Sequence, residues 1–118
     1  MAQGVMDEKI DAYKIGLGHM NDALPGVVEA YHNFTGACFA EGRLGAKEKQ
    51  LIALGISLFA NNEVCTMYHV NEALSKGAHP QEVLEAAAVA AAVGGGHAMS
   101  QGVTRVQRAL EAASGGAR

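Results

Sequence analysis

The chain has 118 residues, of which 49% are apolar, and its formal net charge is -3 at pH 7. That length suits one domain of the commonest size, so we treat residues 1–118 as a single domain. Nucleic acid is bound by clustered basic side chains, and a chain with a net negative charge gives no sign of such a cluster. Nucleic acid is therefore excluded as the default partner.

The apolar residues are mostly small or aliphatic, with three Phe, three Tyr and no Trp. Cores rich in alanine are typical of closely packed helices. A chain of this size also exposes much of its surface, so spare alanine-rich faces favour contacts between subunits. We therefore expect a homo-oligomer.

Neither export nor membrane insertion is indicated. Charged side chains interrupt residues 1–14, where a signal peptide would be apolar. The longest apolar run, residues 83–96, is shorter than the ~20 residues that span a bilayer. We expect a cytoplasmic protein with no membrane segment. In that reducing compartment, Cys38 and Cys65 are not expected to form a permanent disulfide.

Five or six helices are predicted from apolar side chains that recur every three or four positions. In chain order they cover residues 7–19, 25–38, 46–60, 63–76, 80–94 and 97–113. Pro25 and Pro80 suit first helical positions, and Gly77 suits a helix end. Residues 1–20 form either a helix or a partly ordered arm, and we expect 114–118 to be a disordered tail. No alternating segment bounded by hairpin turns is present, so the predicted fold class is all-α.

In two of these helices the apolar side chains gather on one face. On the second helix the apolar positions are Val27, Val28, Tyr31, Phe34, Ala37 and Cys38. On the last helix they are Val103, Val106 and Leu110. Helical spacing places each set on one apolar face, and Cys38, which has the spacing of a core position, is favoured as core filler.

Cys65 and His69 are four positions apart on the fourth predicted helix, so their side chains lie one turn apart on one face. Cys65 falls in the first turn after a cap by Asn61 or Asn62. Unpaired N–H groups and the helix dipole lower the pKa of a thiol there. The charge of Glu63 opposes that effect. A plainer interpretation makes Cys65 a small buried apolar side chain and His69 a hydrogen-bonded core histidine.

Four segments of the sequence carry a family resemblance. They read KQLIALG at 49–55, NEVCTMYH at 62–69, ALSKGA at 73–78 and PQEVLEA at 80–86. In this order they resemble the carboxymuconolactone decarboxylase/AhpD family over about residues 24–110, including the glycines 94–96 before the last helix. The resemblance implies an all-helical oligomer, often a trimer or hexamer. In the redox branch of the family it implies a CxxC pair followed by a histidine.

Two positions depart from that redox pattern. Cys65 and His69 match the second cysteine and the histidine, but Asn62 stands where the first cysteine would be. Gln50 stands where the family has a glutamate, and an amide cannot relay protons as a carboxylate can. A CxxC disulfide therefore cannot form. Glu48 and Glu63 are possible substitutes for the missing carboxylate, although neither occupies the matching position.

With these departures, the resemblance implies a thiol-dependent, peroxidase-like redox enzyme that uses one cysteine. Cys65 would attack a small-molecule substrate such as a hydroperoxide, and His69 would orient it or donate a proton. An external thiol reductant would then restore the sulfenic acid to the thiol. Cys38 is a conceivable resolving partner in place of that external thiol.

Two other functions stay open. A decarboxylase-like lyase or hydrolase acting on a small lactone or carboxylate would use His69 and His97 for acid–base work. A non-catalytic helical oligomer would leave Cys65 buried and inert. His97, which follows three glycines, either faces a cleft beside the Cys65 helix or caps the chain. Met67 and Tyr68 are expected to point away from the cysteine–histidine pair.

No cofactor and no metal are expected. The glycines 94–96 follow a helix rather than a strand, so they are not a dinucleotide fingerprint or a phosphate loop. A metal site needs three or four convergent ligands, and the fourth helix offers only Cys65, His69 and Glu72.

Overall fold

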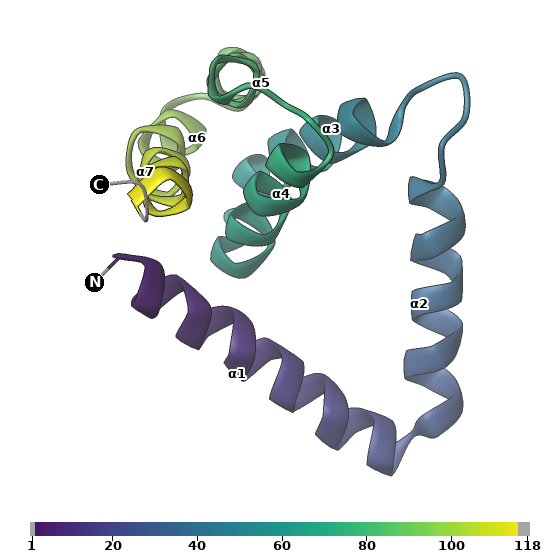
Figure 1. Cartoon of the computed structure of the whole chain (residues 1–118). Coiled ribbons are helices and arrows are strands. Elements are labelled where there is room, and N and C mark those ends of the chain that lie inside the picture. Colours follow the sequence, from purple (N-terminus) through teal and green to yellow (C-terminus); the bar gives the residue numbers. More distant parts are fainter. Residues whose placement is uncertain (1, 116–118) are drawn as a thin grey trace.

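The computed structural model describes residues 2–115 and the side chains of residues 8–114, and every regular element in that range is helical (Figure 1). The elements are α1 (Ala2–Ala23), α2 (Pro25–Phe39), α3 (Ala46–Phe59), α4 (Glu63–Ser75), α5 (Pro80–Gly94), α6 (Gly96–Gln101), the π-helical turn η1 (Gly102–Val106) and α7 (Gln107–Gly115). The all-α fold class is confirmed, and the bounds of α2 to α5 agree with the predicted ranges to within one residue. α1 is longer than the predicted 7–19, so this segment is a helix rather than an arm.

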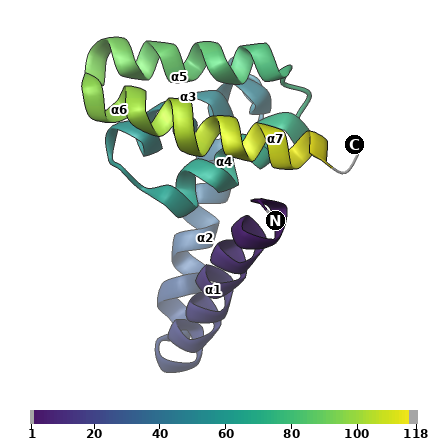
Figure 2. The ribbon, with the colours of Figure 1, turned by 90° about the vertical axis from the view of Figure 1, so that its left-hand side faces the viewer.

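The helices divide into a body and a projecting hairpin. α3, α4, α5 and the C-terminal rod, which is the continuous run of α6, η1 and α7 (96–115), form the body. α1 and α2 meet at Leu24 and project from it as a hairpin, while the start of α1 lies beside α7 (Figure 2). The hairpin is therefore attached to the body at both of its ends, near α7 and near α3.

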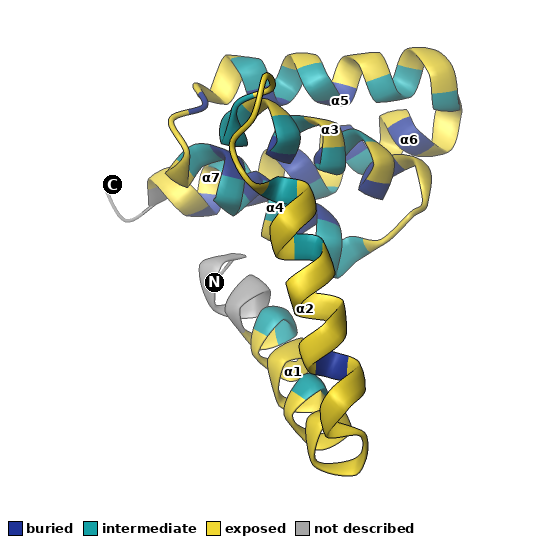
Figure 3. Ribbon diagram, turned by 90° about the vertical axis from the view of Figure 1, so that its right-hand side faces the viewer, coloured by how far each residue is buried: buried dark blue, intermediate teal, exposed yellow. Residues whose placement is uncertain are grey.

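The core lies inside the body, where Figure 3 shows most of the buried residues, in dark blue, and most of the partly buried ones, in teal. Its largest fully buried side chains are Leu54, Leu58, Met67, Val70, Val83, Val106 and Thr66. Alanines fill the remaining core positions, including Ala73, Ala87 and Ala109, and their small side chains let the helices approach closely. Met67 occupies the core, as predicted from its position on the helix.

Most of the apolar face of α2 is exposed rather than packed in the core. Only Val28 is buried, whereas Val27, Tyr31 and Phe34 are 54%, 55% and 66% exposed. Cys38 is exposed as a free thiol, so it is not core filler. The physical reason is that α2 packs against α1 and the start of the body only, which leaves most of its surface facing outward (Figure 3).

The last predicted helix is the C-terminal rod, and the face that it buries differs in part from the predicted one. Val106 is fully buried, but Val103 is 52% exposed. The buried positions are instead Ala98, Gly102, Val106, Ala109 and Ala112. These positions recur at spacings of four, four, three and three residues, so they form one continuous helical face, and Val103 lies beside that face. Residues 114 and 115 of the predicted disordered tail belong to α7, and 116–118 lie outside the described residues.

Apolar side chains also line an open groove between α3 and α5, with a volume of about 450 Å³. Ile56, Phe59 and Val93 stand at its edges and are exposed, and Gly55 and Ala90 form part of its floor. The homo-oligomer expected from the sequence stays a prediction. The exposed apolar residues of this groove are a surface on which contacts between subunits can be tested by substitution. Among the helices described, none has the length and apolar character that crossing a membrane requires.

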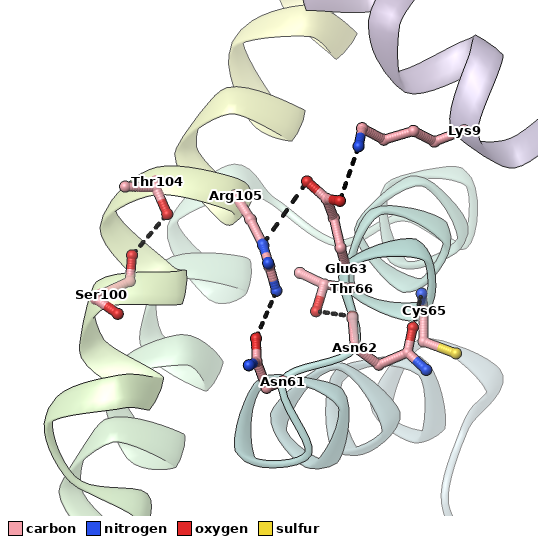
Figure 4. A network of polar contacts seen from close by, with 9 residues as sticks. All are labelled: Lys9, Asn61, Asn62, Glu63, Cys65, Thr66, Ser100, Thr104 and Arg105. Carbon is pink, nitrogen blue, oxygen red and sulfur yellow. Dashed lines mark hydrogen bonds and ion pairs between the residues drawn. The ribbon is translucent and has the colours of Figure 1, made fainter.

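A polar network joins α1, α4 and the C-terminal rod (Figure 4). Lys9 Nζ donates to Glu63 Oε1 at 2.9 Å, and Arg105 Nε lies 3.8 Å from Glu63 Oε2. Arg105 Nη1 also donates to Asn61 Oδ1 at 2.8 Å. The hydrogen bond from Lys9, together with the positive charges of Lys9 and Arg105, holds the pKa of Glu63 below its ordinary value against an opposing effect of burial. Glu63 thus connects three elements that are distant in sequence.

We expect Glu63→Gln to lower the free energy of unfolding at pH 7 by about 1 kcal/mol, because each partly exposed ion pair contributes ~0.2–1 kcal/mol. Since the folded-state pKa of Glu63 is lowered, the stabilisation is present above its ordinary value of 4.5. It is lost as the pH falls through the folded pKa. Urea unfolding at several pH values measures this, with Glu111→Gln, an exposed carboxylate on α7, as the matched control. A deficit that stayed constant down to pH 2 would contradict the assignment.

Candidate active site around Cys65 and His69

The turn between α3 and α4 sets the direction of the Cys65 helix. Asn61 has a positive φ of 59°, a conformation that asparagine tolerates better than most residues. Asn62 then caps α4, because its Oδ1 accepts the backbone N–H of Cys65 at 2.8 Å. Its carbonyl accepts the Thr66 hydroxyl at 2.7 Å. Cys65 therefore sits in the first turn of a helix whose start is anchored by side-chain hydrogen bonds.

Cys65 and His69 line one cavity between the hairpin and the body, with a volume of about 550 Å³. From the hairpin its lining residues are Tyr13, Lys14, Leu17, Tyr31, His32, Thr35, Gly36, Phe39 and Ala40. From the body they are Gln50, Val64, Cys65, Tyr68, His69, Glu72 and Lys76. A cavity of this size holds an organic molecule of moderate size, and both side chains of the pair are half-buried in its wall.

His69 is held by two contacts. Its Nδ1 lies 2.7 Å from Oε1 of Gln50, which is buried, and its ring stacks on Phe39 with centroids 5.7 Å apart and planes 17° apart. An amide oxygen only accepts, so in this pairing Nδ1 carries the proton and Nε2 carries the lone pair. Burial lowers the pKa of His69, and the amide brings no negative charge to offset that effect. His69 is therefore a neutral imidazole at pH 7, with a basic Nε2.

The pKa of Cys65 shifts in the direction opposite to our expectation from the helix start. Burial raises the pKa of the thiol above its ordinary value of 9.0. The N–H of Cys65 is already occupied by Asn62 Oδ1, and no hydrogen bond between described residues reaches Cys65 Sγ. Desolvation is thus not offset by donors that would stabilise a thiolate. At rest the pair is a thiol beside a neutral imidazole.

The other sequence candidates divide between this cavity and other parts of the molecule. Gln50 lies in the cavity wall and contacts His69, while Asn62 caps the helix beneath Cys65. Glu63 lies on the other side of α4 in the ion-pair network, and Cys65 points away from that network (Figure 4). His97 does not line the cavity; its Nε2 lies 2.8 Å from the carbonyl oxygen of Phe59, at the end of α3.

Aromatic side chains that the sequence analysis did not assign to the site complete the cavity. All three tyrosines of the chain, Tyr13, Tyr31 and Tyr68, line it. Tyr68 was expected to point away from the cysteine–histidine pair, and that expectation is wrong. Its ring lies edge-on to His69, with centroids 5.2 Å apart. For Tyr13 no local signal could have revealed this position, because it depends on α1 folding back across α4.

The part of the chain described here contains no cluster of three or more His, Cys, Asp or Glu side chains suited to a metal ion. Cys38 is exposed and does not line the cavity, although Phe39 and Ala40 beside it do. Gln50, Cys65 and His69 are thus the candidate residues that the fold brings together.

Comparison with known proteins shows what this chain resembles. Over 79 residues it is 28% identical to an uncharacterized protein of Cupriavidus necator, a match that covers 67% of this chain and 70% of that protein. A carboxymuconolactone decarboxylase family protein of Legionella pneumophila has a similar crystal structure, with a TM-score of 0.84 and 20% identity over 90% of this chain and 95% of that one.

A second crystal structure, of a carboxymuconolactone decarboxylase family protein of Thermotoga maritima, has a TM-score of 0.75 and 23% identity over 93% of this chain and 97% of that one. At such identities the two structures establish the fold alone. The family itself rests on the match of residues 25–114 to the model of the carboxymuconolactone decarboxylase family. Because that match covers most of the chain, this protein belongs to the carboxymuconolactone decarboxylase family.

Proposed function

We propose that the protein is a thiol-dependent, peroxidase-like redox enzyme in which Cys65 is the nucleophile and His69 its base. The observation that supports this most directly is the pairing of a half-buried thiol with a neutral imidazole in one cavity. A thiol with a raised pKa needs a base to become nucleophilic, and His69 Nε2 is a base one helical turn away. The related protein of Thermotoga maritima has been suggested to take part in an antioxidative response.

The reaction balances with these two groups and an organic hydroperoxide. His69 Nε2 accepts the Cys65 proton as the sulfur attacks the terminal oxygen of the peroxide. The S–O bond forms, the O–O bond breaks, and the leaving alkoxide takes the proton from His69 to become an alcohol. Sulfur is oxidised to the sulfenic acid by two electrons, and the peroxide is reduced. An external thiol then condenses with the sulfenic acid, releasing water, and a second thiol frees Cys65 by exchange.

An external reductant fits the placement of the cysteines. Asn62 stands where a vicinal cysteine would resolve the sulfenic acid, and it serves as a helix cap instead. Cys38 is exposed and outside the cavity wall. The lyase alternative is less well supported, because it relies on His69 and His97 acting together. His97 is instead hydrogen-bonded to the carbonyl oxygen of Phe59 and does not line the cavity of His69.

Alkylation of Cys65 tests the state of the thiol. In Cys38→Ser protein, we expect the rate of reaction with iodoacetamide to keep rising from pH 7 past pH 9, because burial raises the pKa of Cys65 above 9.0 and the thiolate is the reacting form. Mass spectrometry of the intact protein measures the rate. A plateau reached near pH 7 would instead indicate a thiolate already formed at rest.

Replacing the amide beside His69 tests its role in setting the charge of the ring. We expect Gln50→Glu to raise the pKa of His69, because a carboxylate at Nδ1 stabilises the imidazolium where the amide does not. Titration of the histidine ring protons by NMR measures it, with the His69 signal assigned by its loss in His69→Ala. Gln107→Glu, which changes an exposed residue on α7, is the control and should leave the titration of His69 unchanged.

Peroxide consumption tests the function itself. We expect the Cys38→Ser protein to reduce an organic hydroperoxide with a small thiol as reductant, Cys65→Ser to abolish that activity, and His69→Ala to lower its rate about 100- to 1000-fold, within the range for loss of a general base. Trapping of the sulfenic acid on Cys65 with a dimedone-type reagent supports the same step. Equal activity in the Cys65→Ser variant would overturn the proposal.

A further inference from the structure

The hairpin places a phenol across the cavity from Cys65. Tyr13 lies on α1, which packs against α4, and its side chain lines the cavity that Cys65 and His69 also line. It is 45% exposed, so protein covers part of the side chain and leaves the rest accessible. Tyr31 and Tyr68 line the same cavity from α2 and α4. A hydroperoxide bound against Cys65 would therefore lie among hydroxyl donors.

Tyr13 and Cys65 line the same cavity, and the protonation state of Tyr13 decides whether it can donate. Burial raises the pKa of Tyr13, and the charges of Tyr31 and then of Cys65 raise it further. Tyr68 is coupled to the same group, since burial, Glu72 and then Tyr13 raise its pKa. Tyr13 therefore remains a protonated hydroxyl, able to donate, throughout the neutral range.

The reaction proposed above needs such a donor. When the O–O bond breaks, negative charge develops on the leaving oxygen before the proton arrives from His69. His69 is fixed on the same helix as Cys65, and its Nδ1 is occupied by Gln50, so only Nε2 serves the reacting atoms. A hydrogen bond from the opposite wall would stabilise the leaving oxygen without competing for that nitrogen.

We propose that the Tyr13 hydroxyl donates a hydrogen bond to the leaving oxygen of the hydroperoxide while Cys65 attacks the other oxygen. This inference rests on the proposed function. Tyr13 keeps its own proton: the proton that completes the alcohol comes from Cys65 through His69. The site is thus built from both walls, with nucleophile and base on α4 and the donor to the leaving group on α1.

The test compares two reactions of the same thiol in Cys38→Ser protein. With a hydroperoxide the leaving group is an alkoxide that needs a donor, whereas iodoacetamide releases iodide, which does not. We expect Tyr13→Phe to lower the second-order rate of Cys65 oxidation by the hydroperoxide about 100-fold, a typical loss for one donor to a developing oxyanion. Its alkylation rate should equal that of the parent. Ile15→Ala, an exposed α1 change outside the cavity wall, is the matched control for both reactions.

The outcomes separate the two proposals. If the parent protein consumes no hydroperoxide, the proposed function fails. If the parent is active and Tyr13→Phe is equally active, or loses both reactions together, the role of Tyr13 is overturned while the function stands. Should Tyr13→Phe fold poorly, a second measurement uses Cys38→Ser protein that also carries Tyr31→Phe and Tyr68→Phe. Tyr13 is then the one tyrosine whose phenol titrates. Carboxymethylation of Cys65 adds a negative charge and should move the phenol titration of Tyr13 to higher pH than neutral carbamidomethylation does, and equal titrations overturn the proposal.

Discussion

The reversal of the chain between α3 and α4 is the constraint on which the rest of the site depends. Asn61 makes the turn with a positive φ, and Asn62 fixes the first turn of α4 through the N–H of Cys65. This sets the rotation of α4 about its axis. One face then directs Cys65 and His69 toward the hairpin, while Glu63 points to Lys9 and Arg105 on the other side. The cap thus orients the face that carries Cys65 and His69, and the ion pairs on the opposite face hold α1 near α4.

The pairing of His69 with an amide gives the site its resting charge. A carboxylate at Nδ1 would favour an imidazolium and, through it, a thiolate. With Gln50 in that place, both members of the pair are neutral, and the buried wall avoids the cost of desolvating two charges. In the proposed reaction, charge would then develop only in the transition state, where donors facing the cavity stabilise it most effectively. A neutral resting pair and a cavity lined by tyrosine hydroxyls both fit that proposal.

Helix bounds and the Cys65–His69 pair could be predicted because their signals are local. Proline at the start of α2 and of α5 and glycine after α4 act within one turn, and an i, i+4 spacing fixes a shared face. Burial could not be predicted where it depends on the partner of a helix. Cys38 has core spacing, yet α2 has no helix covering that side among the described residues. The place of Tyr13 likewise depends on the distant fold of α1 over α4, and the raised pKa of Cys65 depends on burial that only the tertiary fold sets.

The buried face of the C-terminal rod has a consequence for the substitutions that the rod can tolerate. Ala98, Gly102, Val106, Ala109 and Ala112 recur at spacings of four, four, three and three residues, so one continuous helical face stays buried through η1. All of these residues except Val106 are alanine or glycine, and a Cβ atom on Gly102 would already lie 3.5 Å from the Cβ of Ala87 on α5. A larger side chain on this face would therefore have to push the rod and the body apart, because no gap is left for it to fill.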